Sequence, residues 1–229
     1  MSFVPTLDTD SPQRPRIPRT LDPTELRILG SLMEKQMSTP EYYPLTLNAL
    51  VAATNQKSNR EPVMELSESD VQRALDRLQD ERLVWRVMGG RAVRFDHNLD
   101  KVWHLKPGEK AVLTLLFLRG PQTPGELRGR SDRLHKFDSV DEVESLLRDM
   151  AAHSEPLVRE LQRRPGQKET RWAHTVGGAT VEEPGLGASG FAAADVPASE
   201  PLSVRVTRIE QRVEELAQQL RALMQKLGE

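Results

Sequence analysis

Five histidines are the side chains in this sequence that most often take part in metal binding or acid–base catalysis, and they are scattered along the chain. None lies in an HExxH spacing, and none has neighbouring His or Asp residues at a recurring ligand spacing. Cysteine is absent, which excludes disulfides, thiolate metal sites and cysteine nucleophiles. No GxSxG turn and no Walker loop occurs. The sequence therefore predicts a protein that is not an enzyme and holds no metal or cofactor.

Basic side chains in three short stretches offer a different chemistry, the neutralisation of phosphate groups. The total charge gives no such indication, because 32 lysines and arginines face 34 aspartates and glutamates, a formal net charge of -2. Each stretch alone is also typical of a solvated loop, but their joint placement on loops and a hairpin favours binding of double-stranded DNA. The predicted contacts in these stretches are Lys57, Asn59, Arg60, Arg128, Arg130, Arg133, Lys136, Arg163, Arg164 and Lys168.

The helix predicted over residues 67–80 could add recognition of bases, because its outward face carries amide and guanidinium groups. Asp76 and Asp80 on the same face would repel phosphates. The corresponding helix after Ser139 is less suited to a DNA groove, because its face has three carboxylates and one arginine, and that face suits a basic protein partner. The predicted base contacts of the first helix are Gln72, Arg73 and Arg77.

The elements that carry these side chains follow a recognisable order. A capping box at residues 22–25 starts a helix, and apolar residues then recur at helical spacing. Further helices are expected over 46–54 and 67–80, followed by a strand at 83–88, a Gly89-Gly90 turn and a return strand at 91–95. Three helices followed by a hairpin is the order of a winged helix.

The same order occurs a second time. A helix starting at Pro107, a capping box at 123–126, a helix capped by Ser139 and strands at 157–161 and 170–174 repeat it with matching apolar positions. The expected fold is mainly α with small β wings (α+β), with two tandem winged-helix domains over residues 21–104 and 105–175. Two generic small helical domains are the alternative.

The segments outside these domains differ in composition. Residues 1–20 are rich in proline and 176–201 in Gly, Ala, Pro and Ser, which predicts a disordered tail and a flexible linker. Alternating apolar spacings of four and three over 202–229 predict a coiled-coil helix that favours a parallel dimer. The alternative is an amphipathic helix that folds back onto the wings. The predicted seam is Val206, Ile209, Val213, Leu216, Leu220 and Leu223.

One stretch carries a family resemblance. NQKSNREPVMELS at 55–67, followed by ALDRL at 74–78, resembles the signature of the YceH-like family of uncharacterised bacterial proteins. Residues 21–35 and YPLTLNAL at 43–50 resemble it as well, so the match runs from about residue 21 to 174. The resemblance implies a fold of two tandem winged helices and leaves the biochemical role open.

These patterns predict a non-enzymatic protein that binds double-stranded DNA as a dimeric regulator, the tail supplying a two-fold symmetry suited to paired half-sites. The alternative is a protein–protein adaptor that uses its winged helices as docking surfaces. No apolar run reaches membrane-spanning length and no secretory signal is recognised, so the expected location is the cytoplasm, without a membrane partner.

Overall fold

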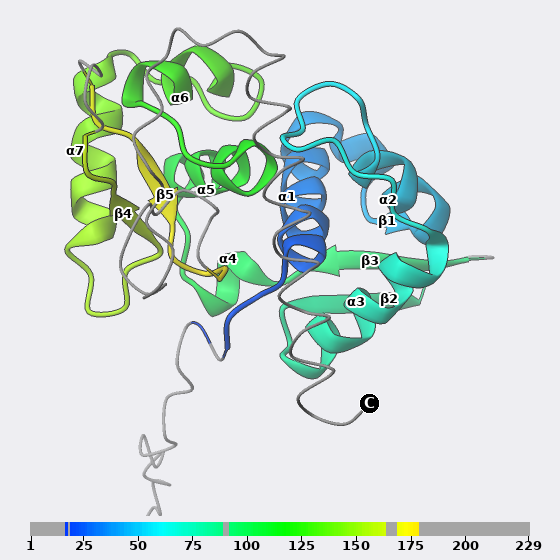
Figure 1. Cartoon of the computed structure of the whole chain (residues 1–229). Helices are drawn as coiled ribbons and strands as arrows, with labels where there is room; N and C mark the ends of the chain where they lie inside the picture. The colour runs from blue at the N-terminus through cyan, green and yellow to red at the C-terminus, as the bar shows by residue number, and fades with distance from the viewer. Residues whose placement is uncertain (1–16, 18, 89–91, 164–168, 179–229) are drawn as a thin grey trace, which may run out of the picture. The chain divides into compact units, whose positions relative to one another are not determined.

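The computed structural model describes residues 17, 19–88, 92–163 and 169–178 (Figure 1). Within these residues the chain is mixed α+β, with seven α-helices, a three-stranded sheet and a two-stranded sheet. The predicted coiled-coil segment, the linker beyond residue 178, the tail before residue 17 and the tips of both hairpins lie outside the described residues.

Lobe 1, our name for residues 21–106, holds the first set of helices and the three-stranded sheet, whose order is β1-β3-β2 with antiparallel neighbours. The hairpin register pairs Arg86 with Phe95 and Met88 with Val93. The elements are α1 (Pro23–Ser38), the 3-10 helix η1 (Pro40–Tyr42), β1 (Leu45–Thr46), α2 (Leu47–Thr54), α3 (Glu68–Asp80), β2 (Val84–Met88), β3 (Val93–His97) and the short α4 (Leu99–Val102), which the sequence pattern did not predict.

α1 and α3 begin where the sequence predicts, because a capping box closes each N-terminus. The Asp22 carboxylate accepts the Glu25 N–H and the Glu25 carboxylate accepts the Asp22 N–H, both at 2.9 Å. Ser67 and Asp70 make the same exchange before α3, at 3.2 and 3.0 Å. The predicted inner face of α3 is fully buried and consists of Val71, Ala74, Leu75 and Leu78.

Lobe 2, residues 107–178, repeats the order of three helices and a hairpin. The predicted capping box before its second helix is confirmed: the Thr123 hydroxyl accepts the Glu126 N–H at 3.2 Å and Glu126 accepts the Thr123 N–H at 3.0 Å. The strands are shorter than predicted, with three residues each. The elements are α5 (Pro107–Arg119), α6 (Pro124–Ser131), α7 (Val140–Ala151), β4 (Val158–Glu160) and β5 (Trp172–His174).

The two lobes are joined by α1 and α5, which lie side by side at the centre of the described body (Figure 1). Gly30 makes this approach possible: a Cβ there would lie 2.9 Å from Leu118 Cδ2 and 3.0 Å from Phe117 Cβ, closer than side chains tolerate. Residues 111–118 of α5 are all buried, since lobe 1 covers one side of the helix and lobe 2 the other. The lobes therefore form one packed unit.

The structure differs from the sequence-based boundaries at both ends of this unit. Val176, expected in the flexible linker, is fully buried, and its carbonyl accepts the Leu21 N–H at 3.0 Å. Arg19, expected in the disordered tail, binds the Glu25 carboxylate at 2.8 Å and Glu81 at 3.3 Å. Local composition did not reveal these long-range contacts.

Candidate functional site

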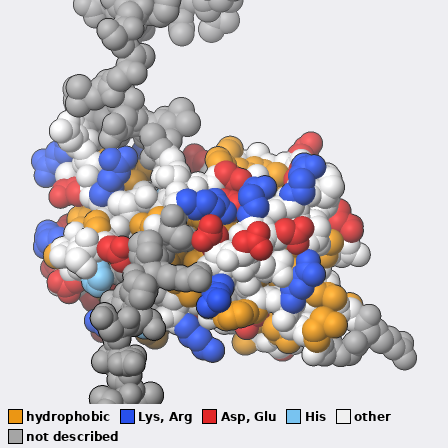
Figure 2. Space-filling model, turned by 90° about the horizontal axis from the view of Figure 1, so that it is seen from below, with side chains coloured by type: hydrophobic (Ala, Val, Ile, Leu, Met, Phe, Trp, Pro, Cys, Tyr) orange, Lys and Arg blue, Asp and Glu red, His pale blue; other side chains and the backbone are white. Residues whose placement is uncertain are grey.

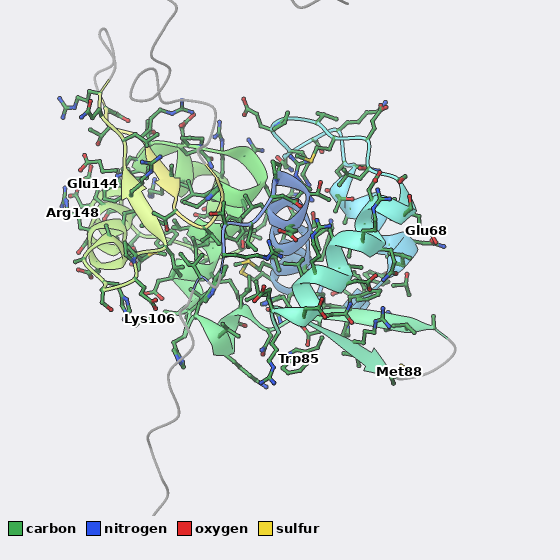
Figure 3. The ribbon with its side chains drawn as sticks, turned by 60° about the horizontal axis from the view of Figure 1, so that its bottom comes forward. Glu68, Trp85, Met88, Lys106, Glu144 and Arg148 are labelled. Carbon is green, nitrogen blue, oxygen red and sulfur yellow. The ribbon has the colours of Figure 1, made fainter. Side chains whose placement is uncertain are left out.

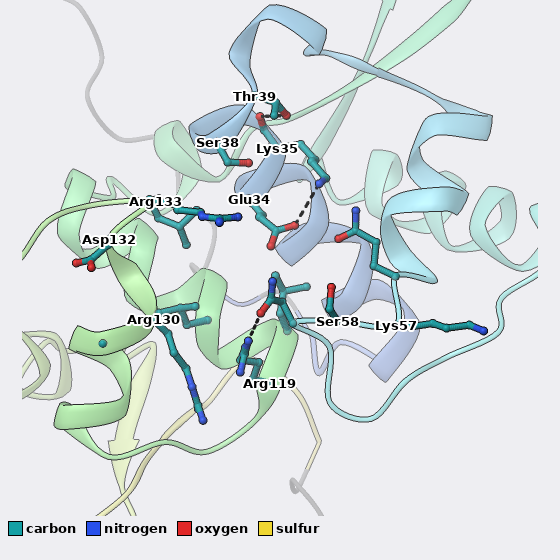
Figure 4. Close-up of a pocket in the computed structure, with 16 residues that line it drawn as sticks. Glu34, Lys35, Ser38, Thr39, Lys57, Ser58, Arg119, Arg130, Asp132 and Arg133 are labelled. Atoms are coloured by element: carbon teal, nitrogen blue, oxygen red, sulfur yellow. Dashed lines mark hydrogen bonds and ion pairs between the residues drawn. The ribbon is translucent and has the colours of Figure 1, made fainter.

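A groove of about 1120 Å³ opens between the lobes (Figure 4). Lobe 1 contributes the C-terminal end of α1 and the loop 56–59, and lobe 2 contributes the end of α5, part of α6 and the turn that follows it. We call it the interlobe groove. Its lining has five basic residues, Lys35, Lys57, Arg119, Arg130 and Arg133, against two acidic residues, Glu34 and Asp132.

One of the two acidic residues is already neutralised. The Glu34 carboxylate binds the guanidinium of Arg60, with Nη2 to Oε2 at 2.6 Å and Nη1 to Oε1 at 3.1 Å. Lys35 also approaches Glu34, at 3.8 Å. The interlobe groove therefore carries a surplus of positive charge although the whole chain is slightly acidic.

Arg60 has a different place from the predicted one. Its side chain has no exposed surface, and besides Glu34 it donates to the Ala53 carbonyl at 3.1 and 3.0 Å and to Gln56 Oε1 at 3.0 Å. Ala53 lies in the last turn of α2, where carbonyl groups lack helical partners. Arg60 thus closes the end of α2 and is not available at the surface to contact a phosphate.

The polar loop after α2 is fixed by its own side chains, by α1 and by lobe 2. The Asn55 side chain accepts the Leu66 N–H and donates to the Leu66 carbonyl, both at 2.8 Å. The buried Arg27 donates to the Pro62 carbonyl at 2.6 Å, and the Glu61 N–H donates to the Leu118 carbonyl at 2.8 Å. The loop therefore contacts both lobes, and its residues 57–59 are exposed at the groove.

Two groove cations are not engaged elsewhere. Lys57 and Arg133 are exposed, and neither makes an ion pair or hydrogen bond with any residue in the described part of the chain. Arg130 donates to Gln122 Oε1 at 2.7 Å and lies 3.3 Å from Glu126. Lys57 comes from lobe 1 and Arg133 from lobe 2, and Figure 4 shows Lys57 directed away from Arg133, so the groove offers unneutralised charge at two separate places.

The outer face of α3 presents the opposite situation. Each of the three predicted base contacts is bonded to a carboxylate: Gln72 to Asp76 at 2.8 Å, Arg73 to Asp70 at 2.5 Å, and Arg77 to Glu25 at 2.7 Å. Arg77 also binds Asp22, the N-cap residue of α1, at 2.5 Å. Positive and negative side chains alternate over the face of the molecule that Figure 2 shows.

Glu25 is the centre of this network. Burial of the side chain raises its pKa, but hydrogen bonds from Arg19, the Asp22 N–H and Arg77 outweigh burial and lower the pKa to about 2. Glu25 is therefore a buried carboxylate held ionised between two arginines, and it joins α3 to the start of α1. This arrangement accounts for the position of Arg77 without any ligand.

The other predicted contacts fall into two groups. Arg128, on α6, donates to the Asp138 carbonyl at 3.0 Å. Both Arg128 and Lys136, which follows α6, are exposed, and neither lines the interlobe groove. Arg163 is exposed at the end of β4's hairpin arm. Arg164, Lys168 and every residue of the predicted dimer seam lie outside the described residues.

The hairpin of lobe 1 exposes three large apolar side chains that sequence reasoning missed, with Met88 and Val93 on one side and Trp85 on the other. Met88 is 82% exposed, Trp85 46% and Val93 40%. Figure 3 shows Met88 at the end of β2, away from lobe 2. The strand sequence VWRVM could have indicated this, because four of its five residues are apolar. In a strand with one buried face, alternate residues face solvent, so some of these apolar side chains must be exposed.

The buried histidine of lobe 1 has a structural environment. His97 Nδ1 accepts the Leu99 N–H at 3.3 Å, so Nε2 carries the proton and donates to Gln36 Oε1 at 2.8 Å. Among the described residues, no three His, Asp or Glu side chains come together in a way that could hold a metal ion. Within the same residues, no helix is long and apolar enough to cross a membrane.

Comparison with known families gives the chain its place. A family model described as "Protein of unknown function, DUF480" matches residues 21–167, which include lobe 1 and lobe 2 through β4. The chain belongs to the DUF480 family. A UPF0502 protein from Citrifermentans bemidjiense is 51% identical over 180 residues, covering 75% of this chain and 84% of the relative.

Two further relatives extend the match over more of the chain. A UPF0502 protein from Chromobacterium violaceum is 44% identical over 210 residues, 91% of this chain and 92% of the relative. One from Burkholderia vietnamiensis is 43% identical over 229 residues, 100% of this chain and 94% of the relative. The predicted membership in an uncharacterised bacterial family is thereby confirmed, while the DUF480 description attaches no activity to it.

Proposed function

We propose that this DUF480 protein binds double-stranded DNA as a dimeric, non-enzymatic regulator, with backbone phosphates held in the interlobe groove. One observation carries the proposal: Lys57 and Arg133, from different lobes, line one groove and are exposed, and neither has a partner among the described residues. Unneutralised cations in a concave surface raise the local concentration of a polyanion. DNA carries one phosphate charge per about 1.7 Å of helix axis and is the polyanion such a surface fits.

The proposal includes a tandem winged-helix architecture. Two features support it: three helices precede an antiparallel hairpin in each lobe, and in lobe 1 a short strand before α2 adds to the hairpin, giving the order β1-β3-β2. Proteins of this kind contact DNA with the third helix and with the hairpin. Dimerisation rests on the apolar seam of residues 206–223, a proposal from the sequence.

The distribution of charge favours phosphate contacts over base contacts. A guanidinium or amide reads a base edge by directing its donors outward, whereas Gln72, Arg73 and Arg77 direct theirs to carboxylates. Phosphate contacts orient a protein on the duplex without reading sequence. We therefore expect affinity for duplexes of any sequence, with little base preference from α3.

Fluorescence anisotropy with a labelled duplex of mixed sequence, titrated with salt, tests the proposal. The logarithm of the binding constant should fall linearly with the logarithm of salt concentration, with a slope of about 0.9 per phosphate neutralised. Charge reversal by Lys57→Glu with Arg133→Glu should weaken binding by about tenfold or more.

The matched control is Arg73→Glu with Arg148→Glu, which changes the net charge equally but on residues already paired with Asp70 and Glu144. Arg148 and Glu144 lie on α7, on the side of lobe 2 away from lobe 1 (Figure 3). An equal loss in both double variants would mean that the net charge, not the groove, governs binding. Absence of binding even at low salt would overturn the proposal.

A second function, docking of a protein partner, has one observation in its favour. Met88 and Val93, a cross-strand pair, expose apolar surface on one side of the hairpin, as protein-binding surfaces do, and Trp85 is exposed on the other side. In this alternative, Met88→Asp should abolish a complex that survives nuclease treatment, with Ala92→Asp, also exposed beside the hairpin tip, as the control. Loss of the complex in both variants, or in neither, would contradict docking through this apolar surface.

A further inference from the structure

Strand β2 forms an edge of the lobe 1 sheet and exposes apolar side chains on both of its faces. Met88 is 82% exposed on one face, and Trp85 is 46% exposed on the other. Figure 3 shows both along the border of the molecule, where no described helix or strand lies beyond β2. A ligand packed against one face of the sheet would leave the other side chain in water, whereas a strand added at the edge places side chains beside both faces.

The hydrogen bonds of the hairpin show which main-chain groups of β2 are directed outward. In an antiparallel pair, residues alternate between those that bond the partner strand and those that point away from it. The Asn98 N–H donates to the Leu83 carbonyl at 2.8 Å, and these two residues continue the register of β2 and β3. The odd-numbered residues of β2 therefore bond β3. The N–H and carbonyl groups of Val84, Arg86 and Met88 point away from it.

A contact on the far side of β3 agrees with this alternation. His97, which lies opposite Val84, donates its N–H to the Tyr43 hydroxyl at 2.9 Å, on the side of β3 where β1 pairs. Val84 itself is buried, so the accessible part of the edge consists of Arg86 and Met88, both exposed. Among the described residues, the outward main-chain groups of Arg86 and Met88 have no hydrogen-bond partner.

The sequence of β2 does not protect this edge against pairing. Exposed edge strands commonly carry a proline, a lysine or a bulge that prevents another strand from adding to them. The strand VWRVM has no proline or lysine, and its register with β3 is continuous. Its one charged residue, Arg86, is bonded to Asp76 of α3 at 3.0 Å. The edge is thus open to a further strand.

We propose that β2 pairs with β2 of a second copy of this chain, antiparallel and about a two-fold axis through Val87. Arg86 of each copy then lies opposite Met88 of the other, and these two pairs exchange about four main-chain hydrogen bonds. The two Val87 residues form the non-hydrogen-bonded pair at the centre, with their Cα atoms about 4.5 Å apart.

Charge and burial select this centre and a second copy as the occupant. An axis through Arg86 would place two guanidinium groups opposite each other and would require the main chain of the buried Val84. With the axis at Val87, Trp85 of each copy lies diagonal to Val87 of the other on one face. Met88 lies beside the aliphatic part of Arg86 on the other face. One strand thereby supplies the apolar cover for both of its own exposed faces.

The interface is independent of DNA binding and of the proposed seam at residues 206–223, and it adds a second contact to the dimer of the proposed function. A pairing of this length buries a small area, so we expect a weak and transient contact on its own. A covalent trap is therefore the suitable test.

Single cysteines in the full chain provide that trap, because the natural sequence has no cysteine. Val87→Cys should form a disulfide-linked dimer with oxidised glutathione, since its Cα separation falls within the range of about 4.4–6.8 Å that a disulfide needs. The matched control is Val93→Cys, a valine on β3 whose Cα atoms would lie about 14 Å apart, three strand spacings. Val93 is more exposed than Val87, so random collision would favour the control. We expect Val87→Cys to cross-link at least about tenfold faster, and equal rates would overturn the proposal.

A second substitution tests the main-chain bonds. In the Val87→Cys chain, Met88→Pro removes an outward N–H but no bond to β3, and edge strands accept proline at such positions. Cross-linking should slow by about tenfold, with circular dichroism to check the fold. If this variant does not fold, Trp85→Lys, which adds an edge lysine, takes its place. An unchanged rate in the folded variant would overturn the pairing.

Two comparisons separate this interface from the other proposals. Val87→Cys combined with Val213→Asp and Leu220→Asp removes the apolar seam; cross-linking that persists at raised protein concentration supports the edge, and its loss at every concentration overturns it. Cross-linking without DNA binding in the salt titration leaves the interface intact and removes the proposed function. DNA binding without preferred cross-linking of Val87→Cys does the reverse.

Discussion

The outer face of α3 and the interlobe groove contain similar side chains, yet their electrostatics differ. On α3, Arg73 and Arg77 each bind a carboxylate at 2.5–2.7 Å. In the groove, Lys57 and Arg133 are exposed and have no partner in the described residues. The number of basic residues on a surface therefore does not determine its attraction for an anion; what matters is how many of them are already neutralised.

Arg60 and Arg119 differ in burial and in bonding although both lie at the boundary between the lobes. Arg60 is enclosed and satisfied by Glu34, Gln56 and backbone carbonyls, so it stabilises the fold. Arg119 is partly enclosed, and its Nε–H has no acceptor among the described residues. Arg60, which stabilises the fold, and Arg119, which lines the groove, are thus close neighbours, since Arg119 bonds Asn59.

The largest expected effect concerns the structural cation. Arg60→Ala should reduce the free energy of unfolding by about 3–5 kcal/mol, because Glu34 and the end of α2 lose their partner in a buried setting. Urea unfolding followed by circular dichroism measures it. Arg73→Ala, which removes an exposed pair, should cost less than about 1 kcal/mol. A similar loss of unfolding free energy for the two substitutions would show that the buried contacts of Arg60 do not stabilise the fold more than an exposed ion pair does.

The second prediction concerns pH. The pKa of Glu25 is lowered from its usual 4.5 to about 2, so its stabilising contribution is complete above pH 4.5 and is lost as the pH falls towards 2. The loss should be on the order of 3 kcal/mol at most. Unfolding curves at a series of pH values check this, since Glu25→Gln should flatten the pH dependence in that window. The exposed Asp80→Asn should leave it unchanged, and equal flattening would refute the role of the Glu25 network.

The third prediction measures the groove cations directly. Replacing Lys57 and Arg133 together by glutamine should reduce the slope of log binding constant against log salt by about 2, since two phosphate contacts are lost. The loss should be the same for duplexes of different sequence. A slope that does not change would show that neither side chain meets a phosphate.

The smallest expected effect is on α3. Because Gln72 and Arg73 are bonded to Asp76 and Asp70, Gln72→Ala with Arg73→Ala should change DNA affinity less than about twofold. The measurement is anisotropy against a panel of duplex sequences. A larger loss restricted to some duplex sequences would show that α3 contacts base edges in spite of its paired side chains.

Local signals made much of the fold predictable. Helix starts depend on residues three apart, as in the capping boxes of α1, α3 and α6, and the buried face of α3 follows from one helical period. The order of three helices and a hairpin occurs twice in the sequence, and this repeat predicted the two lobes. Strand limits were less accurate, because β4 and β5 have only three residues and their ends depend on packing.

The site was predictable only in part, since it depends on contacts between distant residues. Lys57, Arg130 and Arg133 were identified from charge alone, but the pairing of Arg60 with Glu34, 26 residues away, is invisible in the sequence. Arg119 and Lys35 were missed because they lie on α5 and α1, far from the basic stretches. From the sequence alone, Gly30 is a residue that disfavours a helix. The structure explains its presence, because a Cβ at this position would collide with α5.

The bond between the Leu21 N–H and the Val176 carbonyl has a consequence for how the protein unfolds. The residue before α1 is hydrogen-bonded to one of the last described residues of lobe 2, so the two ends of the described chain lie together and link the lobes. Heating should then melt both lobes in a single calorimetric transition, with equal calorimetric and van't Hoff enthalpies. Because α1 and α5 still pack together, deletion of residues 176–178 should lower the midpoint temperature of that transition without splitting it.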